Sequence, residues 1–255
     1  MTAIGSKTRS QKDSSWLPNF YGRRKGHKIR PARQALVDTL LPRLSAALTQ
    51  PETVDVEGLF DTPPRDLWME IGFGAGEHLA HQAHQNPEIG LIGVEPYING
   101  VAALLATIQA NNLENIRLFD DDVRLLLPRL PDGCLGRLFI LFSDPWPKAR
   151  HNRRRLFTTQ NLSEFARILR PGAVLRFASD DMSYVRQALD IVQKSPDFRW
   201  RPMGPSDWRE RPTDALETRY EAKARSHGRS PAYLTFIRSG TCPLRAPKKT
   251  CNLKL

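Results

Sequence analysis

Acidic residues stand at the ends of four short apolar runs in this sequence. They are Glu70, Glu95, the consecutive residues Asp120, Asp121 and Asp122, and Asp144. Carboxylates gathered around one crevice repel a ligand that carries phosphates, and they attract a cation. They also accept hydrogen bonds from ribose hydroxyls and from an adenine amine. S-adenosylmethionine combines a positive sulfonium with a free ribose and an adenine, so these positions favour it as the cofactor.

A glycine-rich turn follows the first of these acids. In EIGFGAGEHL, the residues Gly72, Gly74 and Gly76 precede a helix that is expected to begin near Glu77. Glycine lets the backbone approach a ligand closely, whereas a dinucleotide-binding turn needs the pattern G-x-G-x-x-G. The pattern G-x-G-x-G argues against a diphosphate, and we assign Gly72 and Gly74 to the cofactor. An ordinary tight turn remains the alternative.

The segment SDPWPKARHNRRRL joins an acid to a group of cations. Asp144 precedes two prolines that restrict the backbone on either side of Trp146. The cations that follow are Lys148, Arg150, Arg153, Arg154 and Arg155. A rigid acid beside side chains that can hold phosphates predicts a site for an anionic substrate. The alternative is a stiff turn next to a solvated helix.

Six apolar runs predict the strands that must position these residues. They cover residues 66–71, 89–95, 116–119, 136–143, 173–179 and 232–237. Helical periodicities lie between them, over residues 98–108 and 182–192. This alternation predicts an α/β fold with a doubly wound, mostly parallel sheet and helices on both faces. Such sheets bind ligands at the carboxyl ends of their strands, where the acids stand.

The net charge of +11 is concentrated at the two ends of the sequence. Residues 1–30 carry eight basic residues and one acid, and residues 241–255 carry four basic residues and no acid. We therefore expect a flexible basic tail over residues 1–30, a single domain over residues 31–240, and a second basic tail over residues 241–255. Such tails serve solubility alone, or they contact nucleic acid.

The sequence gives no sign of a metal or of a membrane. Its three cysteines lack C-x-x-C spacing, and we interpret His78, His81 and His84 as a solvated helix face. There is no apolar run of about 18 residues and no apolar export signal. We expect a cytoplasmic protein without metal or membrane partners, either a monomer or a homodimer.

Six motifs resemble those of the bacterial tRNA guanine-N7 methyltransferases in order and spacing. They are EIGFGAGEHL, GVEPY, FDDDV, SDPWPKARHNRRRL, FASDD and TRYEAKARSHG, and the similarity runs from about Gly22 to Phe236. The segment from Asp144 to Arg155 is the most specific of them. The resemblance implies a class I methyltransferase fold, which is Rossmann-like with a seven-stranded sheet. It also implies methylation of N7 of the guanine at position 46 in the tRNA variable loop, with S-adenosylmethionine as the donor.

The resemblance further implies roles for individual residues. The cofactor residues are Glu70, Glu95, Asp121 and Asp144, and Asp144 is also the catalytic residue. The substrate residues are Lys148, Asp180, Thr218, Arg219, Tyr220 and Glu221. The RNA-binding residues are Arg150, His151, Asn152, Arg153, Arg154 and Arg155. The sequence departs from the usual family pattern by additional acids at Asp122 and Asp181, so whether Asp122 replaces or assists Asp121 at the adenine stays open.

Methylation of guanine N7 suits a site built from carboxylates. N7 carries a lone pair and no proton, so the enzyme needs no general base, only alignment and stabilisation of the cationic product. Asp144 is the expected source of that stabilisation. Asp180 and Glu221 are expected to accept hydrogen bonds from N1–H and from the N2 amine of guanine. Alternatively, Glu221 pairs with Arg225 along a helix at a spacing of four.

A second class of function remains open from the sequence. A small-molecule methyltransferase or a nucleotide-binding protein needs the same carboxylates, and its basic tails serve solubility alone. Salt dependence separates the two classes, because neutralising phosphates releases counterions.

Overall fold

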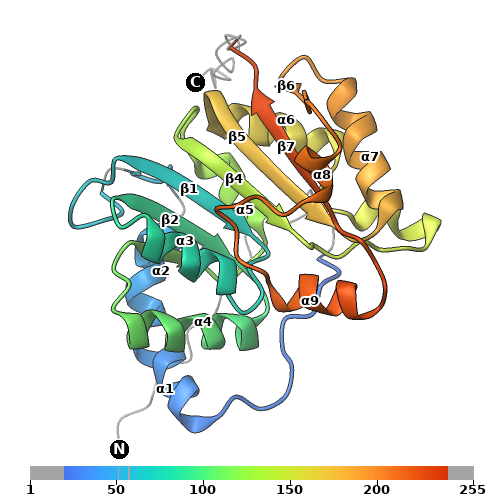
Figure 1. The fold of residues 1–255 in the computed structure, drawn as a ribbon. Helices are drawn as coiled ribbons and strands as arrows, with labels where there is room; N and C mark the ends of the chain where they lie inside the picture. The colour runs from blue at the N-terminus through green and yellow to red at the C-terminus, as the bar shows by residue number, and fades with distance from the viewer. Residues whose placement is uncertain (1–19, 51, 57, 241–255) are drawn as a thin grey trace, which may run out of the picture.

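A seven-stranded sheet organises the chain. The structure is a computed structural model that describes residues 20–50, 52–56 and 58–240. The strand order is β3-β2-β1-β4-β5-β7-β6 (Figure 1). The strands are β1 (Asp66–Ile71), β2 (Ile89–Val94), β3 (Ile116–Phe119), β4 (Leu135–Leu141), β5 (Leu169–Ser179), β6 (Phe198–Arg199) and β7 (Ala232–Arg238). The predicted α/β fold with a mostly parallel sheet is confirmed.

The first five strands run parallel, and β7 runs antiparallel to both β5 and β6. Parallel strands are buried on both faces, which explains why β1 and β2 are apolar along almost their whole length. All six predicted strands are present; β1 and β3 match their predicted ranges, and the other four differ at one or both ends. The seventh, β6, was missed because its two residues, Phe198 and Arg199, are too few to show alternation.

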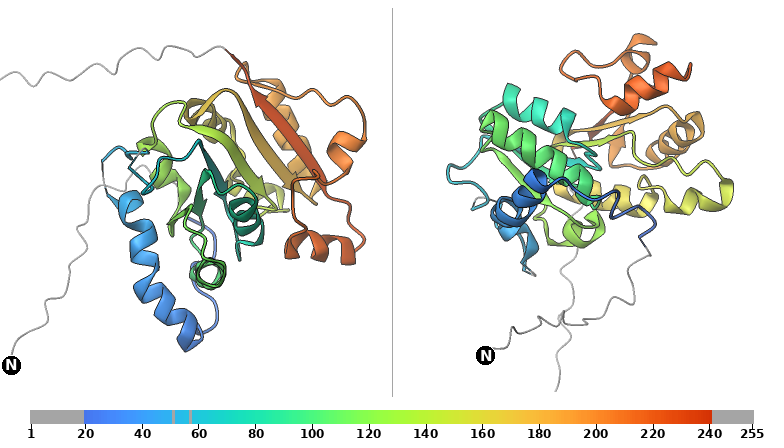
Figure 2. Two further views of the ribbon diagram at one scale, coloured as in Figure 1. Left: turned by 60° about the vertical axis from the view of Figure 1, so that its left-hand side comes forward. Right: turned by 90° about the horizontal axis from the view of Figure 1, so that it is seen from below.

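Helices cover both faces of the sheet (Figure 2). They are α1 (Pro31–Thr39), α2 (Leu41–Thr49), α3 (Glu77–Gln85), α4 (Ile98–Asn111), α5 (Val123–Leu126), α6 (Thr159–Ile168), α7 (Met182–Gln193), α8 (Ser206–Arg209) and α9 (Arg219–Ser226). Helices α3 and α4 pack with Trp68 and Leu91, while α6 and α7 pack on the other face with Met69 and Ile140. Within the described part, none of these helices is both long enough and apolar enough to cross a membrane.

Two helices that follow strands, α5 and α7, have an aspartate as their N-terminal cap. Asp122 accepts a hydrogen bond from the Arg124 backbone N–H at the start of α5, and Asp181 accepts one from Tyr184 N–H at the start of α7. Asp122 therefore has the cap role that its position before α5 suggests. The two additional acids that depart from the family pattern both stabilise local structure.

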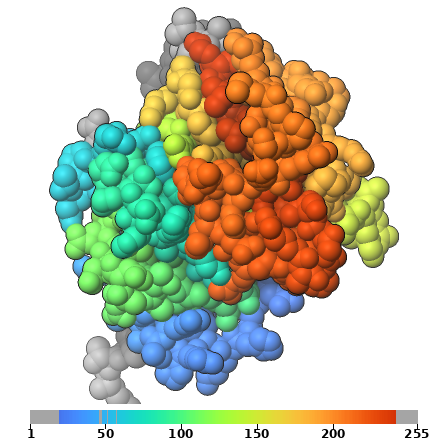
Figure 3. All heavy atoms as spheres, viewed as in Figure 1, coloured from blue at the N-terminus to red at the C-terminus, as the bar shows by residue number. Residues whose placement is uncertain are grey.

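The segment between β6 and β7 crosses the surface beside α3 and α4 and carries α8 and α9 (Figure 3). Asp214 attaches it to the sheet by accepting from Arg137 at 3.1 Å and from Arg176 at 2.7 Å. Farther along, Arg219 forms an ion pair with Glu77 at the start of α3. These ion pairs hold α9 above the carboxyl end of β1.

Candidate functional site

A cavity of about 1060 Å³ opens at the carboxyl ends of β1, β2 and β4. The residues predicted from the sequence that line it come from five separate segments. They are Gly72, Gly74, Glu95, Asp122, Asp144, Arg153, Arg154, Arg155 and Tyr220. The structure thus brings residues far apart in the sequence to the crevice where a doubly wound sheet binds its ligand.

Glu95 anchors the glycine turn on one side of the cavity. Its carboxylate accepts hydrogen bonds from the backbone N–H of Gly74 at 2.8 Å and of Tyr97 at 2.9 Å. Gly72 and Gly74 both have positive φ, which lets the turn bend back over β1 at no steric cost. Burial raises the pKa of Glu95, partly offset by the two N–H donors, and the nearby Asp144 and Glu70 add to the rise.

Gly100, which the sequence did not single out, packs against the same turn. It lies in the first turn of α4, and a Cβ built there would be 2.1 Å from the carbonyl oxygen of Gly74. A side chain at residue 100 therefore cannot coexist with the observed turn. The only sequence signal was the glycine itself within a helical periodicity, a feature that also occurs without functional meaning.

Glu70 lies beneath the turn rather than along the cavity. Its carboxylate is 3% exposed and pairs with Nδ1 of His78 at 2.7 Å. The solvated interpretation of the histidines is wrong for His78, which is buried and contacts Phe139 edge-on. Gln82 approaches Nε2 of His78 at 3.3 Å and donates to the carbonyl of Asp214. Glu70 and His78 thus join β1, α3 and the segment that carries α9.

The N-terminal end of the described chain lies along the cavity. Phe20, Tyr21 and Arg23 line it, and Arg24 forms a 2.6 Å ion pair with Asp121. Residues 20–30, which the sequence places in a basic tail, therefore contact the domain. Residues 1–19 and 241–255 lie outside the described residues.

Asp144 occupies a sharply bent turn after β4. The residues two before and two after it, Phe142 and Trp146, have φ values of 52° and 43° in the left-handed region. Non-glycine residues rarely adopt this conformation, and they cluster at functional sites when they do. Asp144 lines the cavity and remains exposed to solvent, and the partial burial of its carboxylate raises its pKa.

The arginine run divides between two directions. The 3-10 helix η2 (Ala149–Arg154) exposes Arg150 and Arg153. Arg154 stacks over the rings of Tyr21 and Trp146, with its Cζ atom 4.2 and 5.0 Å from their centroids. Arg155 differs from the expectation for an RNA-binding residue, since it is 3% exposed and points into the protein. Adjacency in sequence carried no signal for this inward direction.

Three other residues predicted from this segment lie near the rim. Lys148 is exposed at the end of the turn after Asp144. His151 contacts the Trp146 ring edge-on at 6.1 Å. Asn152 is half-buried, and its Oδ1 atom has no hydrogen-bond partner among the described residues.

Tyr220 brings α9 to the cavity. Its ring lies so close to the glycine turn that a Cβ at Gly74 would be 2.8 Å from it. Thr218 caps α9 by accepting from the Glu221 backbone N–H at 3.2 Å, and Arg219 holds the helix to Glu77. The first turn of α9 thus faces the glycine turn at the edge of the cavity.

Glu221 points away from the large cavity and is 1% exposed. It accepts from the hydroxyl of Tyr233 at 2.6 Å and pairs with Arg225 at 3.0 Å and with Arg211 at 3.4 Å. The pair at a spacing of four is therefore present. Asp180, at the end of β5, pairs with Arg229 at 2.9 Å. Both predicted guanine-reading acids contact arginines of the C-terminal segment.

These contacts predict a stability effect for Glu221. Glu221→Gln is expected to lower the free energy of unfolding by about 1–3 kcal/mol, because the amide keeps an acceptor for Tyr233 but loses the charge that pairs with Arg225. Urea unfolding measures the change. Glu217→Gln is the matched control, because Glu217 meets the same Arg225 at 3.6 Å from a more exposed position and should lose little. Unchanged stability together with lost methylation of guanine would assign Glu221 to base recognition instead.

Within the described ranges, no three His, Cys, Asp or Glu side chains gather in a way that could hold a metal ion. The sole cysteine in that part of the chain, Cys134, is half-buried, and burial raises its pKa to about 12. This thiol is therefore protonated at neutral pH and is a poor metal ligand.

Comparison with known proteins identifies the family. A family model described as "Putative methyltransferase" matches residues 64–233. A tRNA (guanine-N(7)-)-methyltransferase of Rhodospirillum rubrum is 56% identical over 222 residues, which cover 86% of this chain and 87% of that protein. The chain belongs to the tRNA (guanine-N(7)-)-methyltransferase family. A second member, from a Ruegeria species, is 48% identical over 226 residues that cover 86% of this chain and 88% of its own.

Proposed function

We propose that this member of the tRNA (guanine-N(7)-)-methyltransferase family transfers a methyl group from S-adenosylmethionine to N7 of a guanine in tRNA, at position 46 of the variable loop. One observation carries the proposal. The glycine turn anchored by Glu95 and the carboxylate of Asp144 share one cavity, and exposed arginines of η2 stand on its rim. A tRNA substrate places the reaction in the cytoplasm.

The residues of the cavity fit the cofactor. A Cβ at Gly72 would meet nothing within 4 Å, so the backbone there is open to a ligand. Glu95 is held in place by two N–H donors and keeps further lone pairs for ribose hydroxyls. Asp121 is assigned to the adenine, with Asp122 as the helix cap beside it. Glu70 supports the turn from below through His78.

The chemistry requires alignment and charge stabilisation from this chain. The cofactor supplies an electrophilic methyl group on a sulfonium, and guanine N7 supplies a lone pair, so no residue has to remove a proton. Asp144 lines the cavity and stabilises, by its negative charge, the positive charge that develops on the guanine ring. Its backbone is fixed by the flanking left-handed residues and prolines.

The cationic rim is assigned to RNA. Lys148, Arg150, His151, Asn152, Arg153 and Arg154 lie on or near η2 and are proposed to contact phosphates and the bases next to the target. Arg155 is left out because it is buried. The guanine side of the cavity is assigned to Asp180, Thr218, Arg219, Tyr220 and Glu221. Tyr220 lines the cavity there. Asp180 and Glu221 pair with Arg229 and Arg225 and so hold the segment that carries Tyr220.

Mass spectrometry of tRNA nucleosides after incubation with the protein and labelled S-adenosylmethionine tests the proposal. We expect 7-methylguanosine at about one residue per tRNA molecule, at position 46. Label on another nucleoside, or no label in tRNA while a small molecule is methylated, would refute it.

The assignment of η2 to RNA predicts a salt effect. Replacing Arg150, Arg153 and Arg154 by alanine is expected to reduce the slope of log K against log salt by about 2, because each neutralised phosphate contributes roughly 0.7 to 0.9. Filter binding of tRNA at several salt concentrations measures this slope. Calorimetry should find the cofactor affinity unchanged. If wild-type binding proved independent of salt, the arginines would be only a solvated surface.

A further inference from the structure

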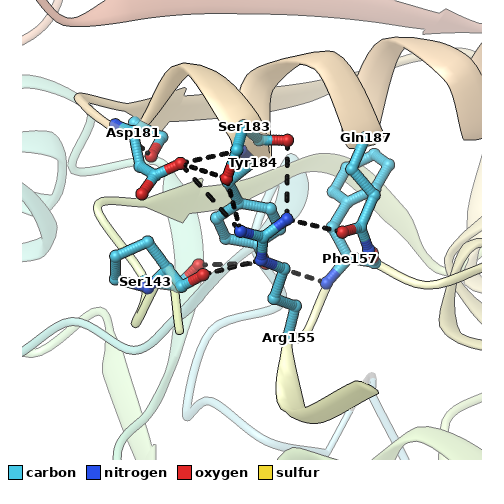
Figure 4. A network of polar contacts seen from close by, with 9 residues as sticks. Ser143, Arg155, Phe157, Asp181, Ser183, Tyr184 and Gln187 are labelled. Atoms are coloured by element: carbon cyan, nitrogen blue, oxygen red, sulfur yellow. Dashed lines mark hydrogen bonds and ion pairs between the residues drawn. The ribbon is translucent and has the colours of Figure 1, made fainter. Parts of the chain in front are cut away.

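Arg155 is the buried end of the arginine run. Its guanidinium donates through Nε to the backbone carbonyl of Pro145 at 2.6 Å, and through the two Nη atoms to Gln187 Oε1 at 2.6 Å and Ser183 Oγ at 2.7 Å (Figure 4). A buried guanidinium must find partners for its donors, and these partners come from the turn after β4 and from α7. Arg155 therefore links Pro145, the residue after Asp144, to helix α7.

Tyr184 contacts Ser143, the residue before Asp144. It lies on α7, is fully buried, and its hydroxyl accepts from the Phe157 backbone N–H at 2.9 Å and from Ser143 Oγ at 3.4 Å. The guanidinium of Arg155 stacks over its ring, with Cζ 4.9 Å from the centroid. Figure 4 shows the two side chains in contact between α7 and the segment around Ser143. Tyr184 and Arg155 thus form one unit.

This unit holds both neighbours of Asp144. Ser143 is bonded to Tyr184 and Pro145 is bonded to Arg155, so the acid stands between two attached residues. The turn needs such support because Phe142 and Trp146 hold left-handed conformations, which persist only where the surroundings enforce them. Nothing else in the proposed reaction uses either side chain.

We propose that Arg155 and Tyr184 are positioning residues that fix the Asp144 carboxylate for methyl transfer. This inference rests on the proposed function of Asp144. Both side chains act through the residues next to Asp144, Arg155 through Pro145 and Tyr184 through Ser143. Without the unit, the turn relaxes, and a displacement of about 1 Å at a reacting group can lower a rate by about 100-fold.

Two variants test the proposal. Arg155→Lys keeps the charge but replaces the planar fork by a single ammonium, which cannot reach three partners in the same geometry. Tyr184→Phe removes only the hydroxyl. Each is expected to lower the single-turnover rate at saturating tRNA and cofactor by about 10- to 100-fold. The dissociation constant and salt slope for tRNA should match those of the wild type.

Two further variants calibrate the result. Arg186→Ala removes an exposed arginine of the same helix, α7, and should change neither rate nor affinity. Arg153→Ala, on the rim, should weaken tRNA binding and reduce the salt slope. If Arg155→Lys behaved like Arg153→Ala, with a weaker complex and a normal saturating rate, Arg155 would be an RNA ligand and the proposal would be wrong.

Hydrogen exchange tests the positioning independently of activity. In Tyr184→Phe, which should fold because only a hydroxyl is lost, the peptide spanning residues 141–148 is expected to exchange faster than in the wild type, with other peptides of the sheet unchanged. Normal protection in that peptide would overturn the proposal. If the wild type did not methylate tRNA, but the peptide still exchanged faster in Tyr184→Phe than in the wild type, only the proposed function would be contradicted.

Discussion

Asp144→Asn is expected to lower the rate of methyl transfer about 100- to 1,000-fold, the usual cost of removing one group aimed at developing charge. The amide keeps the size of the side chain but loses the negative charge that stabilises the methylated guanine. Single-turnover kinetics with saturating tRNA and cofactor measure the rate of the chemical step. Melting temperatures close to that of the wild type would show that the loss is not one of folding.

The pH dependence of the methyl-transfer rate is the control for the role of Asp144. Burial raises the pKa of Asp144, so the charged form is present above that pKa and is lost as the pH falls through it. The wild-type rate should therefore decline on the acid side at a higher pH than an ordinary aspartate would give. The decline due to Asp144 should be absent in Asp144→Asn. A variant with the wild-type rate, or with an unchanged acid limb, would remove Asp144 from the chemistry.

Gly100→Ala is expected to weaken cofactor binding at least about 10-fold, although residue 100 need not touch the cofactor. The added Cβ would lie 2.1 Å from the Gly74 carbonyl, so either α4 or the glycine turn must move. Overpacking of this kind also destabilises a fold by roughly 1–3 kcal/mol. Because Glu95 holds Gly74 through its N–H, the displacement reaches the residue assigned to the ribose. Calorimetric titration with S-adenosylmethionine measures the affinity.

Gly204→Ala is the matched control for this glycine. A Cβ there would meet only the Ser206 hydroxyl oxygen at 3.9 Å, and its backbone does not have positive φ. Its cofactor affinity should equal that of the wild type. Equal affinity in Gly100→Ala as well would show that the turn tolerates movement without loss of the site.

The sequence predicted the sheet and the positions of its acids because both depend on residues that are close together in the sequence. The buried strands appear as continuous apolar runs, and their carboxyl ends meet in a parallel sheet, so Glu95 and Asp144 had to approach each other. Asp122 caps α5 for an equally local reason, since the helix begins directly after it. These features need no knowledge of distant partners.

The direction of a side chain and its contacts with residues distant in the sequence could not be predicted from neighbouring residues. Arg154 and Arg155 are neighbours of the same type, yet one stacks on Tyr21 at the rim and the other bonds Gln187 in the interior. His78 was misinterpreted because the acid that binds it, Glu70, belongs to another element. Gly100 was missed for the same reason, since its constraint is the backbone of a turn far back in the sequence.

The place of β7 has a consequence for how the protein is made. This last strand of the described chain lies between β5 and β6, so the edge of β5 stays open on the ribosome until residues 232–238 have been synthesised. Chains fold from the N-terminus as they emerge, and an unpaired strand edge recruits other chains. Translation products that stop after α8 therefore carry an aggregation hazard that the full-length chain removes when β7 inserts.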